Sequence, residues 1–202
     1  LFPEEEKTCN YSLDDPAGLG RVRFRVNITP GRVPGGVSAQ LTIRTLPSQP
    51  IPLTKLNLEP EITEHFRPYQ GLNLICGPTG SGKSTLMSSL VRWRLETPGA
   101  NEKIITFEKP IEYTFDGISS PDSFVWQTDL GNMLRPRQGR DEHAIWAYAI
   151  RNALRRKPSM IVLGEMRDRP TIEAGIEGAL TGHLLLSTLH TIGVPETMRR
   201  LV

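Results

Sequence analysis

Two stretches near the start of the chain alternate strictly between apolar and polar residues. Every second residue is apolar in residues 21–28, and the same pattern returns in residues 37–46. A period of two predicts half-buried β-strands, and the prolines and glycines in residues 30–36 predict a turn between them. We therefore expect a hairpin whose polar outer face carries four arginines, namely Arg21, Arg23, Arg25 and Arg44. Two interpretations remain open for them: a solvated edge kept soluble by charge, or a binding role.

Further along the chain, short apolar runs alternate with stretches in which apolar residues recur every three or four positions, as in a helix. Buried strands are expected at residues 72–76, 103–107, 160–163 and 183–188. The first strand leads into a helix that ends near residues 97–99. The loss of period in residues 110–139 predicts a loop with one short strand near 124–127.

Two more helices complete this part of the pattern. Apolar residues at helical spacing predict a helix that opens at Asp141. Asp168 is suited to cap a second helix over residues 169–180, and Gly182 is suited to end it. The resulting order of strands and helices predicts an α/β fold with a mostly parallel sheet and right-handed crossovers.

Three prolines predict a stiff, extended linker over residues 47–56. We expect residues 1–46 to be the C-terminal part of a small N-terminal α+β domain, and residues 57–202 to be the main α/β domain. Because residues 1–7 resemble neither a signal peptide nor a native start, and the last helix has no end signal, we expect a fragment of a longer protein.

Composition indicates a globular protein but excludes few functional classes. The chain has 202 residues, 38% of them hydrophobic, which is enough to build a core. A net charge of +2 makes no general case for nucleic-acid binding. The apolar runs are far shorter than the roughly 20 residues that cross a bilayer, so any membrane association is expected to be peripheral.

A phosphate-binding motif follows the first of the buried strands. Residues 77–85 read GPTGSGKST and fit the pattern G-x-x-x-x-G-K-[ST] in full. Its glycines let backbone N–H groups converge on an anion where a helix begins. In that geometry Lys83 reaches the β- and γ-phosphates, and Ser84 supplies a ligand to Mg²⁺. We predict that ATP with Mg²⁺ binds along Gly77, Pro78, Thr79, Gly80, Ser81, Gly82, Lys83, Ser84 and Thr85.

Acidic residues follow the predicted strands. Hydrolysis of a bound triphosphate needs carboxylates that act on water and on Mg²⁺. Glu108, Glu112 and Glu165 are expected at the sheet edge that carries the phosphate loop, where they can converge on one triphosphate. Each could instead be solvated or cap a helix, and this alternative is most open for Glu112.

Four motifs in order resemble those of a known family. GPTGSGKST is followed by TFEKPIEY, IVLGEMRD and TGHLLLSTLHT, which begin at residues 106, 161 and 181. They are similar to the Walker A, Asp box, Walker B and His box of the secretion-ATPase superfamily, which includes the pilus retraction motor PilT. RNALRRKP and GVPETMRRLV look more like the DotB and TraJ branch, the ATPases of type IVB secretion and plasmid conjugation. The resemblance implies a RecA-like P-loop NTPase core, preceded by part of a PAS-like domain.

The resemblance also implies roles for individual residues. Glu108 would be the catalytic base, and Glu165 would be the Walker B acid that acts on Mg²⁺ and water. His190 would be a catalytic His-box residue, and His183 would contact the nucleotide. Arginines of the small domain would approach a triphosphate: Arg25 and Arg44, with Arg21, Arg23 and Arg32 as further candidates.

Two positions depart from the family pattern. Lys109 and Ser159 stand where the Asp box and the start of the Walker B strand usually have an Asp. Lys109 reverses a charge near the expected phosphates. Because the expected base, Glu108, and the expected metal acid, Glu165, are still present, we expect slow or tuned turnover and not its absence.

Three hypotheses follow. The first is a hexameric ATPase motor, cytoplasmic and peripheral to a bacterial inner membrane, docked on secretion or conjugation machinery. The second is a nucleotide-sensing regulatory subunit of the same machinery with little turnover. The third, a P-loop enzyme acting on DNA, is supported only by the basic clusters, so direct nucleic-acid binding is not expected.

Overall fold

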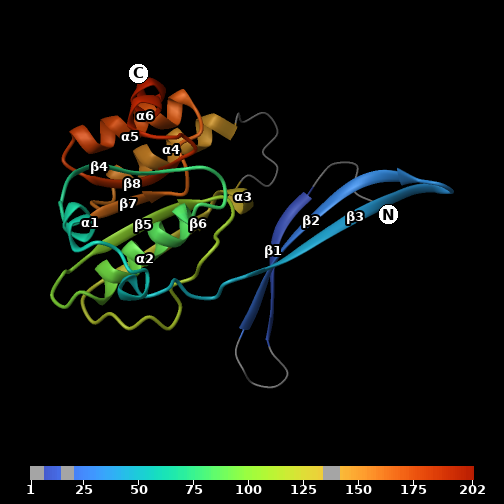
Figure 1. The fold of residues 1–202 in the computed structure, drawn as a ribbon, viewed down its shortest axis with the longest axis horizontal. Coiled ribbons are helices and arrows are strands. Elements are labelled where there is room, and N and C mark those ends of the chain that lie inside the picture. Colours follow the sequence, from blue (N-terminus) through green and yellow to red (C-terminus); the bar gives the residue numbers. More distant parts are fainter. Residues whose placement is uncertain (1–6, 15–20, 134–141) are drawn as a thin grey trace. The chain divides into compact units, whose positions relative to one another are not determined.

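The computed structural model describes residues 7–14, 21–133 and 142–202, which fold into two units (Figure 1). The smaller unit comprises Leu1–Gln49 with Pro110–Thr114, and the larger comprises Pro50–Lys109 with Phe115–Val202. The predicted domain boundaries around a linker at residues 47–56 stay a prediction.

The small unit is a three-stranded antiparallel sheet in the order β1-β2-β3, formed by Lys7–Asp14, Arg21–Val33 and Gly36–Leu46. The hairpin is therefore longer than predicted, and its turn is tighter. Pro30 is accommodated within β2 because the described pairing with β1 ends at Ile28, so its missing N–H removes no bond of that ladder. Gly35 allows the tight turn because it adopts a φ of 105°.

Strand β1 is a strand that the sequence analysis did not identify. Cys9, Tyr11 and Leu13 alternate with polar residues along it, and they pair with apolar residues of β2. The period of two was thus present in the sequence, but the run is short and mostly polar.

The large unit is built on a five-stranded sheet in the order β4-β8-β7-β5-β6, with every neighbouring pair parallel. Its strands are Gly71–Cys76 (β4), Lys103–Glu108 (β5), Phe124–Asp129 (β6), Met160–Leu163 (β7) and Leu184–Leu189 (β8). The predicted parallel α/β architecture is confirmed. Since all five strands run the same way, their carboxyl ends meet at one edge, where ligands of such folds bind.

Helices cover both faces of this sheet (Figure 1). They are Leu53–Lys55 (η1), Pro60–His65 (α1), Lys83–Glu96 (α2), Leu130–Met133 (α3), Glu142–Leu154 (α4), Arg169–Leu180 (α5) and Val194–Leu201 (α6). Helix α2 packs on one face, together with η1, through an apolar cluster that includes Leu90 and Val91. Helices α4 and α5 pack on the other face, where Trp146 and Ile150 are buried. None of the described helices is long and apolar enough to cross a membrane.

Most predicted helix boundaries agree with the structure. Asp168 caps α5 through its side chain, which accepts a hydrogen bond from the backbone N–H of Thr171 at 3.0 Å. Gly182 follows the helix with a φ of 91°. Asp141, predicted to open α4, lies outside the described residues, and α4 is observed from Glu142.

The alternation within β5 decides which residues face α2. Ile104 belongs to the cluster on the α2 side, whereas Ile105 and Phe107 belong to the cluster on the opposite side. Thr106 and Glu108 therefore share the α2 face with Ile104. This places Glu108 on the face covered by the helix that follows the phosphate motif.

Candidate nucleotide-binding site

The phosphate motif forms a compact loop between β4 and α2. Gly80 and Gly82 adopt φ angles of 80° and 89°, which only glycine adopts at low cost. A Cβ atom on Gly77 would lie 2.6 Å from Oγ of Ser81, so a larger residue here would force the Ser81 side chain to move. The Ser81 hydroxyl donates to the carbonyl of Pro78 at 2.8 Å and closes the turn. The loop thus has the shape that the motif predicts.

Lys83, the first residue of α2, points back into this loop. Its ammonium donates to the carbonyls of Gly77 and Pro78 at 2.9 and 2.8 Å, and the residue is only 8% exposed. A buried ammonium held by neutral carbonyls can exchange them for phosphate oxygens, which carry charge. The loop and Lys83 therefore fit a nucleotide phosphate.

Ser84 and Thr85 occupy the first turn of α2, directly after the loop. Among the described residues, no three His, Cys, Asp or Glu side chains gather into a group that could hold a metal ion by themselves. Mg²⁺ fits such a site because it takes few protein ligands and keeps waters and phosphate oxygens as the rest. A hydroxyl at Ser84 and a carboxylate at the sheet edge match that requirement.

Glu165 lies at that edge, two residues after β7. The residues before and after Glu165 are both bonded to Thr188 of β8. The Thr188 hydroxyl donates to the carbonyl of Gly164, and the Thr188 carbonyl accepts from the N–H of Met166. The Glu165 side chain, 18% exposed, forms an ion pair with Arg167.

His190 joins Glu165 to the phosphate loop. Directly after β8, its Nε2 lies 3.6 Å from Oε2 of Glu165, and its Nδ1 lies 3.5 Å from the hydroxyl of Thr79. The three side chains come from the ends of β7 and β8 and from the loop after β4. The structure therefore brings together Thr79, Glu165 and His190 of the predicted set.

Glu108 ends β5 and is 7% exposed. Its carboxylate accepts a hydrogen bond from Thr106 at 2.7 Å and one from Gln127 at 3.1 Å. Strand β5 neighbours β7, so Glu108 and Glu165 follow adjacent strands at the same edge. Neither Gln127 nor Arg167 was proposed from the sequence. Because the register of β6 against β5 decides its contact with Glu108, no local pattern in the sequence pointed to Gln127.

His183 lies at the opposite end of β8 from His190, and its predicted contact with the nucleotide stays a prediction. It precedes β8, and its carbonyl accepts from the N–H of Gly71 at the start of β4. Six residues of strand, or roughly 20 Å at about 3.3 Å per residue, separate it from the edge that carries His190. It is therefore not part of the group around this chain's own phosphate loop.

The arginines and Glu112 belong to the small unit. Arg25 and Arg44 lie directly opposite each other in the pairing of β2 with β3. Arg25 forms an ion pair with Glu112 at 3.2 Å, and both residues belong to the small unit. An approach of Arg25 or Arg44 to a triphosphate stays a prediction.

The two departures from the family pattern lie at opposite ends of the parallel sheet. Lys109 follows Glu108 directly at the carboxyl edge. Ser159 precedes β7 at the amino edge, where its hydroxyl accepts from the N–H of Lys103 at 2.8 Å. Ser159 thus has a structural role in the pairing of β5 with β7, away from the phosphate loop.

Comparison with known proteins agrees with this arrangement. The family described as Type II/IV secretion system protein matches residues 17–202. A twitching motility protein of Neisseria gonorrhoeae is 37% identical over 196 residues, which make up 96% of this chain and 47% of that protein. The structure of the Legionella pneumophila ATPase DotB matches with a TM-score of 0.84 and 43% identity, over 98% of this chain and 51% of that one. The pilus retraction motor PilT with bound ADP matches with a TM-score of 0.77 and 35% identity, over the same two shares.

The chain spans about half the length of the curated relatives it matches. Its parallel α/β fold matches those of DotB and PilT, and the three-stranded sheet is consistent with part of a small N-terminal domain. The resemblance predicted from four ordered motifs is confirmed. The chain belongs to the type II/IV secretion system protein family, within the PilT-like secretion ATPase superfamily.

Proposed function

We propose that this site binds ATP with Mg²⁺ and hydrolyses the terminal phosphate. The observation that carries the proposal is the line of contacts from Thr79 through His190 to Glu165, with Glu108 at the end of the adjacent strand. A phosphate loop alone binds nucleotide, whereas two acids at the same edge supply what hydrolysis needs in addition.

Each group has a distinct task in this proposal. Lys83 and the loop N–H groups bind the phosphates, and Ser84 and Glu165 would hold Mg²⁺. When bound, Mg²⁺ neutralises the charge that develops on the phosphate oxygens. Glu108 accepts a proton from the attacking water, and His190 keeps Glu165 in place relative to the loop.

A nucleotide sensor with little turnover is the second candidate. Lys109 favours it, since a cation next to Glu108 alters the charge at the carboxyl edge. Ser159 does not favour it, because its hydroxyl is used in strand pairing at the other end of the sheet. The presence of Glu108 and Glu165 makes hydrolysis the better supported proposal.

For the full-length protein we infer a hexameric motor of a type IVB-like secretion, conjugation or pilus system. Residues 151–158 and 193–202 carry the likeness to the DotB and TraJ branch, and relatives named for pilus retraction and twitching motility support a motor. A ring follows if Arg25 and Arg44 complete the site of a neighbouring subunit in head-to-tail packing. We place such a motor in the cytoplasm, peripheral to the inner membrane.

The test compares phosphate release by the full-length protein with release by Glu165→Gln and Lys83→Ala. We expect Glu165→Gln to bind a fluorescent ADP analogue nearly as well as the wild type and to lose at least about 100-fold in kcat. Lys83→Ala should lose affinity for the nucleotide as well, because its ammonium contacts the phosphates.

The outcomes separate the candidates. Equal background rates in all three proteins, with retained ATP binding by the wild type, would establish the sensor and reject the hydrolase. If added DNA raised the turnover steeply, with an affinity for DNA that falls as salt is added, the hypothesis of an enzyme that acts on DNA would be favoured instead. Mass measurement of the full-length protein with ATP tests the hexamer separately.

A further inference from the structure

A small polar cluster interrupts the apolar face of the sheet beneath α2. Thr106 and Glu108 are buried on β5, at 1% and 7% exposure, among apolar neighbours. In the pairing of β5 with β6, Gln127 lies directly opposite Thr106, and Asp129 lies opposite Glu108. Residues paired in this way place their side chains on the same face. Buried polar side chains are retained only where hydrogen bonds satisfy them.

The Gln127 side chain is held at both ends. Its amide oxygen accepts from the backbone N–H of Phe115 at 3.4 Å, and its amide nitrogen donates to Oε1 of Glu108 at 3.1 Å. Because a backbone N–H can only donate, the contact with Phe115 determines which end of the amide faces the carboxylate. The NH₂ group is thereby directed at Glu108.

A second donor meets the same carboxylate oxygen. The Thr106 hydroxyl donates to Oε1 of Glu108 at 2.7 Å. The backbone of Glu108 is also held in the sheet, since Glu108 pairs with Asp129 of β6 and Gly164 donates to the carbonyl of the preceding Phe107 at 2.8 Å. With the backbone confined, rotation of the Glu108 side chain is the remaining freedom, and two donors on one oxygen restrict it.

We propose that Gln127 is a positioning residue, which together with Thr106 holds the Glu108 carboxylate in the orientation that accepts a proton from water. This inference rests on the proposed hydrolysis. Gln127 would affect the rate of that reaction only through the position of the Glu108 carboxylate. A misplacement of about 1 Å at a reacting group can lower a rate by about 100-fold. Loss of the Gln127 donor should therefore reduce turnover and leave the phosphate loop unaffected.

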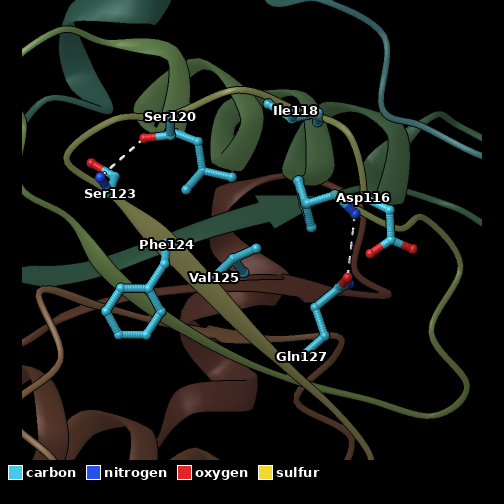
Figure 2. A pocket seen from close by; sticks show the side chains of 9 residues that line it. Asp116, Ile118, Ser120, Ser123, Phe124, Val125 and Gln127 are labelled. Atoms are coloured by element: carbon cyan, nitrogen blue, oxygen red, sulfur yellow. Dashed lines mark hydrogen bonds between the residues drawn. The ribbon is translucent and has the colours of Figure 1, made fainter.

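A cavity of about 360 Å³ beside Gln127 determines which substitution tests this role. Figure 2 shows Gln127 in the cavity wall, on the same strand as Phe124 and Val125. A short side chain at this position would enlarge the cavity and change the packing of the loop that follows Phe115. Gln127→Met preserves the length of the side chain and removes both polar groups, so it is the suitable variant.

The experiment measures kcat, KM, affinity for a fluorescent ADP analogue and Tm of the full-length protein and its variants. For Gln127→Met we expect kcat to fall about 10- to 100-fold, with KM and ADP affinity changed by less than about twofold. Ser123→Ala is the matched control. Its hydroxyl lines the same cavity and accepts from the N–H of Glu102 at 2.9 Å, at the amino end of β6. It should lower Tm and leave kcat unchanged.

A cycle of variants separates positioning from general loss of stability. If Gln127 and Thr106 hold the same carboxylate, Gln127→Met and Thr106→Val together should lose less than the product of their separate losses. In a Glu108→Gln background, Gln127→Met should cause no further loss of turnover.

The proposal is overturned if Gln127→Met behaves like Ser123→Ala, or if it changes KM and ADP affinity without changing kcat. It is also overturned if Gln127→Met lowers turnover as much in the Glu108→Gln background as in the wild type. A wild type that binds ATP without turnover would instead reject the proposed hydrolysis, and that result is recognised before any variant is measured.

Discussion

His190 shows how a single side chain can join parts of a site that separate strands deliver. It contacts the acid after β7 and a hydroxyl of the loop after β4, and it follows β8, which lies between those two strands. The position of its ring therefore depends on both the loop and the acid. If a bound nucleotide displaced the loop, the His190 ring would move with it and change its contact with Glu165.

At this scale we predict that His190→Ala lowers kcat about 10- to 100-fold, as is usual when a residue that orients a metal-binding carboxylate is lost. ADP affinity should fall much less, because Lys83 and the loop N–H groups remain. Phosphate release and titration with a fluorescent ADP analogue measure the two quantities.

We expect His183→Ala to lower kcat less than His190→Ala does, because the effect depends on where the histidine lies. Both residues belong to the same motif, but they lie at opposite ends of β8. His65→Ala, an exposed residue on α1, is the control for loss of an imidazole. If His183→Ala impaired nucleotide binding by an isolated subunit more than His190→Ala did, the assignment of His190 to the site would be wrong.

Among the elements, α2 is anchored at both ends. Its first residue, Lys83, points into the phosphate loop, and near its last turn Arg94 is buried against Glu102 at 2.5 Å. The Arg94 guanidinium also donates to the carbonyls of Phe66, Arg67 and Pro68 in the segment between α1 and β4. The end of the helix is thereby fixed to the segment that leads into β4, the strand before the phosphate loop.

We predict that Arg94→Met destabilises the fold by roughly 3–5 kcal/mol, since it leaves the Glu102 carboxylate buried without its charged partner. The free energy of unfolding, measured in urea, tests this. Arg169→Met is the control because it removes an exposed ion pair with Glu173 and should cost no more than about 0.5 kcal/mol. Similar losses for the two variants would mean that the buried pair contributes no more than an exposed one.

At the scale of the whole molecule, the chain passes from the large unit to the small one two residues after Glu108, the proposed catalytic base. Glu108 ends β5, and from Pro110 the chain belongs to the small unit. There Arg23 donates to the carbonyls of Ile111 and Glu112 at 2.9 Å, and Arg25 pairs with the Glu112 carboxylate. The segment that follows Glu108 is therefore bound to the small sheet by hydrogen bonds and an ion pair.

Arg25→Ala should slow hydrolysis and leave nucleotide affinity nearly unchanged. A contact with the triphosphate predicts a loss of about 1000-fold in kcat, and Glu112→Ala should then cost far less. The double variant should match Arg25→Ala. Equal, small losses in both single variants and in the double variant would mean instead that Arg25 acts only by holding Glu112.

Sequence by itself determined the order along the chain of the strands of the parallel sheet, their direction and the phosphate loop. These follow from local signals, since Gly80, Gly82 and Lys83 carry their conformational and chemical requirements within one short stretch. It also determined that Glu108 and Glu165 lie at the same edge, because that edge is set by strand direction alone.

Only the tertiary structure decided which side chains meet. His183 and His190 belong to one motif, yet the length of β8 separates them. Gln127 contacts Glu108 because of the register of β6 against β5, and Glu112 pairs with Arg25. Strand order and register depend on contacts between residues far apart in the chain, and a local pattern carries no record of them.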